Sequence, residues 1–184
     1  MERPPGDIWI FGYGSLMWRP NFPHLEVQPA LLRGYHRAFC VYSHIYRGTP
    51  ERPGLVLGLD RGGSCRGTAY RVHRSQAGEV LDYLTEREMR TSVYHPRFLA
   101  MTVPGRRIRA HTFVVRRGHR QYAGPLPIAR LVELVLQGEG TKGRCRDYLE
   151  RTVCHLRERA CLEPRLERLH GHVLAAERLR SAAG

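Results

Sequence analysis

The spacing of apolar residues differs between the first two thirds of this 184-residue chain and its last third. In the first part, glycine and proline residues separate short apolar runs, a pattern typical of strands joined by turns. In the last third, apolar residues recur at helical spacing. The predicted strands are Asp7–Phe11, Ala38–Ser43, Leu55–Leu59, Gly67–Val72, Phe98–Val103 and Arg109–Val115.

This separation predicts a mixed α/β fold of the α+β type: a small, mostly antiparallel β-barrel or sheet with packed helices and a helical C-terminal third. A turn is predicted at Arg61-Gly62-Gly63-Ser64, between two of the strands. The length suggests one domain, and no clear linker interrupts the chain. We therefore expect a single domain over residues 7–180.

One helix is predicted within the strand-rich part, over Gln76–Met89, with Ser75 as its N-cap. In the last third, Pro127 lies near the start of a helix that reaches Gln137, and Gly138-Glu139-Gly140 ends it. Two further helices are predicted after this break, Cys145–Ala160 and Pro164–Leu179.

Basic residues dominate the charge, with 30 Lys+Arg against 17 Asp+Glu and a net charge of +13 at pH 7. Lys142 is the only lysine and Asn21 the only asparagine, which indicates a codon bias across the genome more than one binding site. No aromatic pattern typical of RNA binding accompanies the arginines. A basic module that binds nucleic acid or acidic partners is therefore the less favoured alternative, and we expect no nucleic-acid partner.

No apolar run follows Met1 as in a signal peptide, and none approaches the length that spans a bilayer, so we expect no membrane association. The five cysteines lack metal-binding spacing, and we expect free thiols in a reducing compartment. The chain is therefore expected to be cytoplasmic. The sequence does not fix the oligomeric state, and a monomer is the default expectation.

A glycine turn, Gly12-Tyr13-Gly14-Ser15, directly follows the first predicted strand. Two glycines one residue apart allow sharp turning and a close approach of backbone N–H groups to an anionic ligand. Met17 replaces the glycine that a dinucleotide fingerprint or a nucleophile elbow requires, so both motifs are absent. A tight turn without a ligand is the alternative.

Glu88 is the second candidate functional residue, because the helix periodicity points it inward. Ala77, Leu81 and Leu84 define the predicted apolar face, and Glu88 falls about 20° from Ala77 at 100° per residue. Glu86 falls on the opposite, solvent-facing side. Loss of hydration would raise the pKa of the Glu88 carboxyl toward neutrality and suit it to general acid–base catalysis. A buried salt bridge to Arg87, Arg90 or another arginine is the alternative.

Five segments, in this order along the chain, closely resemble the ChaC-like, glutathione-specific γ-glutamylcyclotransferases. The glycine turn lies in the first segment, the second carries RGTP and a following PG, and the third resembles a GxAYR strand. The fourth resembles the family's YLxxRE helix end, and the fifth its YxGPxP motif. The segments are Trp9–Trp18, Arg47–Gly54, Gly67–Arg71, Tyr83–Met89 and Tyr122–Pro127. Where many relatives carry Gly-Gly-Tyr after the glutamate, this chain has Met89–Tyr94, so no contacts are carried over there.

The resemblance implies a γ-glutamylcyclotransferase-like fold and a lyase that converts glutathione to 5-oxoproline and Cys-Gly without a metal or cofactor. It assigns the catalytic acid/base role to Glu88, with Tyr122 as a pocket wall. It also implies a γ-glutamyl pocket formed by Ile10, Phe11, Gly12, Tyr13, Gly14 and Ser15. Arg37 and Arg47 are both candidates to bind a substrate carboxylate. A cyclotransferase for other γ-glutamyl amines or amino acids is the nearer alternative.

The proposed role of Glu88 leads to one further expectation. A nearby guanidinium would lower the pKa of the carboxyl and oppose its action as a base. We therefore predict that the immediate surroundings of Glu88 are poor in arginine, despite the composition of the chain.

Overall fold

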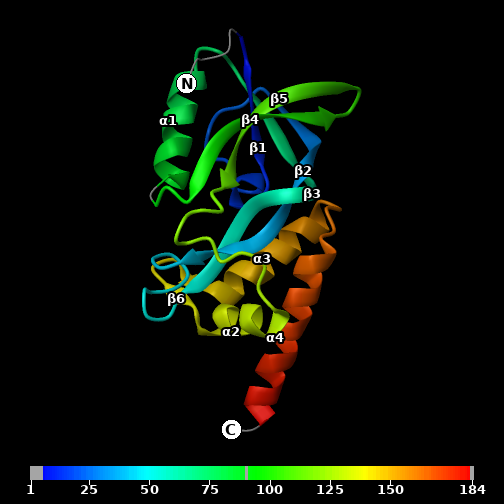
Figure 1. Ribbon diagram of the computed structural model, residues 1–184. Helices are drawn as coiled ribbons and strands as arrows, with labels where there is room; N and C mark the ends of the chain where they lie inside the picture. The colour runs from blue at the N-terminus through cyan, green and yellow to red at the C-terminus, as the bar shows by residue number, and fades with distance from the viewer. Residues whose placement is uncertain (1–5, 90, 183–184) are drawn as a thin grey trace. The chain divides into compact units, whose positions relative to one another are not determined.

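The computed structural model describes residues 6–89 and 91–182 of the chain, and Figure 1 shows its elements. Strands dominate up to residue 115, and helices dominate after it. In chain order, the elements of these residues are β1 (Ile8–Gly12), η1 (Ser15–Met17), β2 (Glu26–Ser43), β3 (Gly54–Val72), α1 (Ala77–Glu88), β4 (Tyr94–Val103), β5 (Arg106–Val115), α2 (Ile128–Gln137), β6 (Glu139–Gly140), β7 (Gly143–Arg144), α3 (Cys145–Glu158) and α4 (Pro164–Ala182).

The long strands form a closed barrel in the order β1-β3-β2-β4-β5, and β6 and β7 form a separate two-stranded sheet. β1 runs antiparallel to β3, with Ile10 opposite Tyr70, and parallel to β5, with Ile10 opposite His111. β4 runs antiparallel to both β2 and β5. The prediction of a small, mostly antiparallel barrel with a helical C-terminal third is confirmed.

Two strands are much longer than the sequence predicted. Ala38–Ser43 is only the end of β2, and Leu55–Leu59 and Gly67–Val72 are the two ends of the single strand β3. The predicted turn at Arg61–Ser64 is wrong, because strand structure continues through it. Gly62 and Gly63 have φ values of +98° and +69°, which glycine adopts without steric cost. They change the local backbone without ending the strand.

The chain divides into two compact units, Met1–Arg37 with Leu59–His119 and Ala38–Gly58 with Arg120–Gly184. Strands β2 and β3 each contribute residues to both units. The expectation of one domain over residues 7–180 stays a prediction.

In the second unit, α2, α3 and α4 pack against one another (Figure 1). Their bounds agree with the predicted helices to within three residues, and Gly138 ends α2 as predicted. No disulfide joins any of the five cysteines, all of which lie in the described residues. No helix within residues 6–89 and 91–182 is long and apolar enough to span a membrane.

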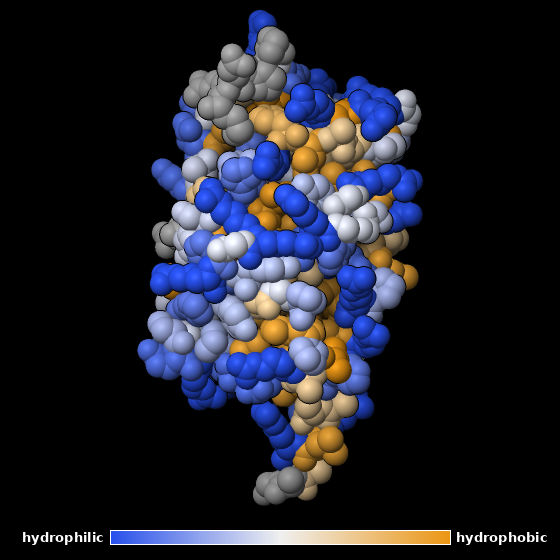
Figure 2. All heavy atoms as spheres, in the orientation of Figure 1, coloured by the Kyte–Doolittle hydropathy of each residue, from blue (hydrophilic) through white to orange (hydrophobic). Residues whose placement is uncertain are grey.

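Hydrophilic side chains cover most of the face shown in Figure 2, with apolar residues visible in small areas between them. The acidic residues are largely engaged in ion pairs. In the first unit, Arg71 contacts both Asp7 and Glu26, and in the second unit Arg146 contacts Asp147, Glu150 and Glu177. Because basic residues outnumber acidic ones, much of the positive charge has no carboxylate partner.

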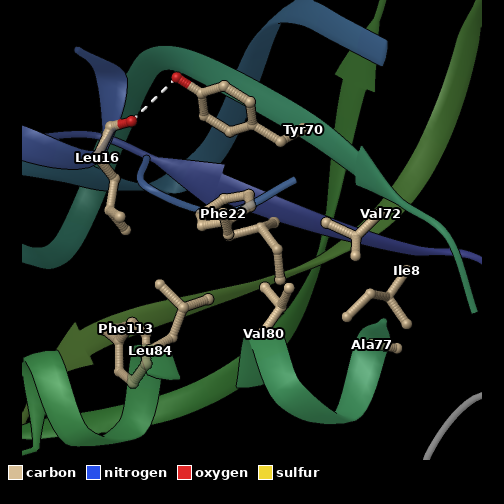
Figure 3. Close-up of a cluster of buried hydrophobic side chains, with 10 residues drawn as sticks. Ile8, Leu16, Phe22, Tyr70, Val72, Ala77, Val80, Leu84 and Phe113 are labelled. Carbon is tan, nitrogen blue, oxygen red and sulfur yellow. Dashed lines mark hydrogen bonds between the residues drawn. The ribbon is translucent and has the colours of Figure 1, made fainter. Parts of the chain in front are cut away.

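The first unit has a core in which α1 packs against the barrel (Figure 3). Ala77, Val80 and Leu84 of α1 point toward apolar side chains of β1, β3 and β5. The buried members of this cluster are Ile8, Ile10, Leu16, Phe22, Tyr70, Val72, Ala77, Val80, Leu84 and Phe113. This packing fixes the end of α1 in relation to the turn that follows β1.

Candidate active site

Helix α1 places Glu88 at its last residue, where the apolar face meets the edge of the core. The buried positions are Ala77, Val80 and Leu84, so Val80 takes the place predicted for Leu81, which is only partly buried. The predicted N-cap is wrong: Gln76 occupies that position, and the Ser75 hydroxyl hydrogen-bonds His73 instead. The inward direction of Glu88 is confirmed, and Glu86 is exposed as predicted.

Burial raises the pKa of the Glu88 carboxyl above its ordinary value. Although 22% of the side chain is exposed, the atoms packed around the carboxyl remove most of its hydration. The negative end of the α1 dipole also disfavours a carboxylate at this position. The charge and hydrogen bond of Arg87 lower the pKa, but they do not outweigh burial.

Arg87 makes the expectation of arginine-poor surroundings wrong. Its Nε lies 3.3 Å from Glu88 Oε1, so the salt bridge weighed as an alternative is present. The two interpretations of Glu88 are therefore compatible, because the carboxyl is both desolvated and paired. Arg90, the other arginine considered, lies outside the described residues.

The glycine turn begins where β1 ends, and η1 follows it directly. The Tyr70 hydroxyl donates to the carbonyl of Leu16 at 2.9 Å (Figure 3) and lies 3.0 Å from the carbonyl of Met17. The Thr112 hydroxyl donates to the carbonyl of Phe11 at 3.1 Å. Gly12 lies close to the start of η1, because an added Cβ would lie 3.0 Å from the Leu16 Cβ and would require η1 to give by a few tenths of an ångström. The turn is thus held by packing and by side chains of the barrel.

Arg37 supports the turn from within the first unit and is 1% exposed. Its Nε donates to the Tyr13 carbonyl, and its Nη2 donates to the Arg66 carbonyl at 2.7 Å and to Met17 Sδ at 3.5 Å. Although the sequence made it a candidate for binding substrate, its guanidinium binds the backbone of the turn. Nothing in the strand pattern distinguishes this buried arginine from the surface arginines nearby.

The predicted pocket residues differ in their accessibility. Ile10 and Phe11 are fully buried in β1, and Gly12, Tyr13 and Gly14 are also buried, whereas Ser15 is partly exposed. The backbone N–H groups of Gly14 and Ser15 make no hydrogen bond to any residue in 6–89 or 91–182. Ser15 and these N–H groups are therefore the parts of the turn best placed to meet a ligand.

A single guanidinium connects this turn to Glu88. Arg87 Nη2 donates to Ser15 Oγ at 2.9 Å, and its Nη1 donates to the Arg19 carbonyl at 2.8 Å. Ser15 and Glu88 come from segments about seventy residues apart, yet both contact Arg87. This contact brings together the two features that the sequence singled out.

Tyr122 and Arg47 belong to the second unit. Tyr122 forms an isolated bridge with Val41, and the next residue, Ala123, donates its N–H to the Cys40 carbonyl at 2.8 Å. Arg47 donates to the carbonyls of Lys142 and Arg144 and lies over the Tyr148 ring. Both candidate substrate arginines therefore bind backbone carbonyls in this structure.

The fold is that of the γ-glutamyl cyclotransferases. A yeast γ-glutamyl cyclotransferase specific to glutathione superposes with a TM-score of 0.82 at 19% identity, covering 94% of this chain and 99% of the yeast chain. A further structure, a γ-glutamyl cyclotransferase, superposes with a TM-score of 0.53 at 16% identity, covering 89% and 86% of the two chains. Identities this low establish the fold alone.

Sequence comparison identifies the family. The profile of the ChaC-like proteins matches residues 8–176, and the chain belongs to this family. A glutathione-specific γ-glutamylcyclotransferase of Escherichia coli is 36% identical over 145 residues, which are 78% of this chain and 63% of that protein. The human glutathione-specific γ-glutamylcyclotransferase 1 is 34% identical over 155 residues, 82% of this chain and 70% of the human protein. The chain thus spans slightly less than two thirds of the length of the Escherichia coli relative.

Proposed function

We propose that the protein is a glutathione-specific γ-glutamylcyclotransferase, a lyase that releases 5-oxoproline and Cys-Gly. The observation that carries the proposal is the desolvated Glu88 carboxyl, linked through Arg87 to Ser15 of the glycine turn. The names of the relatives support the same activity. A carboxyl with a raised pKa can accept and return protons near neutral pH.

In the proposed reaction, the α-amine of the γ-glutamyl group attacks its own side-chain amide carbonyl. The Glu88 carboxylate takes a proton from the ammonium, and the free amine forms the new C–N bond of a five-membered ring. The ring nitrogen then loses its second proton to water. Glu88, now protonated, gives its proton to the leaving nitrogen, and the amide C–N bond breaks. The released Cys-Gly amine takes up one proton from water to become an ammonium. Since the nucleophile and the carbonyl belong to one molecule, the enzyme chiefly has to hold them in a reactive geometry.

The glycine turn supplies the hydrogen-bond donors in this proposal. Backbone N–H groups of Tyr13, Gly14 and Ser15 would hold the substrate α-carboxylate or the oxyanion that develops on the carbonyl. Ile10, Phe11 and Gly12 would contribute backbone and packing, and Tyr122 a wall of the pocket. Ser15 is not assigned as a nucleophile, because its hydroxyl contacts no histidine or carboxylate among the described residues.

The experiment is an assay of the purified protein with glutathione, in which Cys-Gly and 5-oxoproline are quantified. Glu88→Gln keeps the shape of the side chain but cannot transfer protons, so we expect kcat to fall by about 10²- to 10⁴-fold. Glu86→Gln is the matched control on the exposed face of α1 and should retain wild-type activity. Full activity in a folded Glu88→Gln protein would contradict the mechanism.

Substrate choice is tested in the same assay. We expect glutathione to be consumed in preference to γ-glutamyl amino acids and γ-glutamyl amines offered side by side. If 5-oxoproline is released faster from one of those compounds, that compound and not glutathione is the preferred substrate. The proposed role of Glu88 would be unchanged. Binding of nucleic acid that is sensitive to salt and survives Glu88→Gln, without any turnover, would favour the basic-module alternative.

The setting of the enzyme is part of the proposal. We infer a cytoplasmic protein that acts as a monomer on a small-molecule substrate, with residues 7–180 as one functional domain. Cysteines without disulfides fit a reducing compartment, and the passage of β2 and β3 through both compact units fits a single domain.

A further inference from the structure

Arg87 makes polar contacts at the candidate site through all three nitrogens of its guanidinium. Its Nη1 donates to the Tyr83 hydroxyl and the Arg19 carbonyl, each at 2.8 Å. Its Nη2 donates to Ser15 Oγ at 2.9 Å, and its Nε faces the Glu88 carboxylate at 3.3 Å. Only 20% of the side chain is exposed. One planar group therefore joins two positions of α1 to two positions of the turn region.

We propose that Arg87 is a positioning residue, which clamps the glycine turn to the end of α1 and sets the separation between Ser15 and the Glu88 carboxyl. This inference rests on the proposed function, because the separation matters only if both groups meet the same substrate. The planar guanidinium donates in fixed directions, so its contacts specify a geometry that the flexible ammonium of a lysine cannot reproduce.

The clamp also fixes the direction of the Ser15 hydroxyl. A guanidinium has donors and no acceptor, so Ser15 Oγ must accept the hydrogen bond from Arg87. The Ser15 proton is then directed elsewhere, toward an acceptor such as a substrate carboxylate. Arg87 would thus convert Ser15 into a dedicated hydrogen-bond donor.

The clamp places a positive charge beside the catalytic carboxyl. Among residues 6–89 and 91–182, Arg87 is the only charged group that acts on the Glu88 carboxyl. Burial raises the pKa of Glu88, and Arg87 limits that rise. Removing the charge of Arg87 should therefore raise the pKa of Glu88 further and narrow the pH range in which the carboxylate is available as a base.

The test compares kcat/KM for glutathione as a function of pH in the wild type, Arg87→Gln and Arg87→Lys. In Arg87→Gln, we expect the acidic limb to move to higher pH, with a loss of about tenfold or more near pH 6 that shrinks as the pH rises. Arg87→Lys keeps the positive charge but loses the planar set of guanidinium donors. The acidic limb of the kcat/KM profile should therefore stay in place, while the plateau value of kcat/KM falls about tenfold. Arg168→Gln changes an exposed helical arginine that has no ion pair with any residue in 6–89 or 91–182. It is the matched control and should match the wild type.

An unmoved acidic limb in Arg87→Gln overturns the electrostatic part of the proposal, and an unchanged plateau in Arg87→Lys overturns the clamp. If Arg87→Gln does not fold, Arg87→Lys alone carries the test through its plateau. An NMR titration of the Glu88 carboxyl in protein with ¹³C-labelled glutamate separates this inference from the proposed function. A higher titration midpoint in Arg87→Gln supports the pairing even if glutathione is not turned over, and an identical midpoint rejects it.

Discussion

The carboxyl of Glu88 experiences two opposing effects. Burial and the end of the α1 dipole favour its neutral form, and the adjacent Arg87 favours its charged form. Because the pKa is raised overall, holding the carboxylate at neutral pH costs the folded protein free energy. A group that lowers stability in this way is typical of a site kept for chemistry.

This cost predicts how Glu88→Gln affects stability. The unfolded chain titrates at the ordinary value of about 4.3, below the pKa in the folded state, so the wild type loses stability as the pH rises through that interval. Glutamine stays neutral, and we expect Glu88→Gln to be more stable than the wild type near pH 8. Urea unfolding at several pH values measures the difference, which should vanish below about pH 4.

The control for this prediction is Glu86→Gln, since Glu86 is exposed on the same helix. Its unfolding free energy should follow that of the wild type at each pH. A Glu88→Gln protein that is less stable than the wild type near pH 8 would show that the ion pair with Arg87 outweighs burial.

Helical periodicity was sufficient to point Glu88 inward and left Arg87 as one of several possible partners, but it could not show that Arg87 also binds the glycine turn. An apolar stripe points a residue inward whatever it contacts, so the position of Glu88 follows from the spacing in α1 alone. The contacts of Arg87 with Ser15 and Arg19 depend on how β1 and α1 come together in three dimensions. The same limit applies to Arg37, because an arginine in a strand is expected at the surface until its carbonyl partners are known.

Among the elements, β1 and β3 meet most tightly where the glycine turn begins. Gly12 of β1 is paired with Thr68, next to Gly67 of β3. A Cβ added to Gly67 would lie 2.7 Å from the Phe11 ring and closer still to the Gly12 carbonyl oxygen. Glycine at position 67 therefore lets the two strands approach at the edge of the candidate site.

We predict that Gly67→Ala destabilises the protein by about 1–3 kcal/mol, since the backbone of β1 must move to admit the methyl group. The same movement should displace the turn and lower turnover of glutathione. Urea unfolding and the glutathione assay measure the two effects. Wild-type stability would show that the strands can separate at no cost.

Gly171 is a glycine at which substitution by alanine should raise the stability of the protein, in contrast to Gly67. It lies in α4, and an added Cβ would meet no atom within 4 Å. Gly171→Ala should therefore stabilise the protein by about 0.5–1 kcal/mol, because alanine loses less backbone entropy than glycine in a helix.

The helices were predicted more accurately than the strands, for a physical reason. Helix ends are marked by local signals such as Pro127 and Gly138, whereas strands are completed by partners distant in sequence. Gly62 and Gly63 resemble a turn, but pairing with neighbouring strands carries β3 through them. The first half of β2 was missed because its many polar and exposed residues gave no strand pattern.

At the scale of the whole molecule, the excess of positive charge affects the stability of the fold. The acidic residues are mostly paired, so the net charge of +13 reflects arginines that repel one another. Added salt screens this repulsion as well as the exposed ion pairs, which contribute little individually. Because positive charges are in excess, we expect the screening of their repulsion to outweigh the screening of the ion pairs, so that added salt stabilises the protein.

We therefore expect the Tm at pH 7 to rise by about 2–4 °C, or about 1 kcal/mol, when sodium chloride increases from about 20 mM to about 300 mM. Calorimetry or thermal circular dichroism measures this change. A falling Tm would show that networks such as that of Arg146 contribute more than the repulsion removes.

The division of the chain between its two units affects the order in which they can fold during synthesis. Residues 38–58 leave the ribosome early, but the rest of their unit begins only at Arg120. Leu55, for example, hydrogen-bonds through its backbone to Cys145. Synthesis proceeds at about 5–20 residues per second, so residues 38–58 wait several seconds before their partners are made. During this time the side chains of Phe39, Val41 and Leu57, which are buried in the folded protein, stay exposed. A nascent chain stalled near residue 119 should therefore bind chaperones through residues 38–58, although every residue of its first unit has been made.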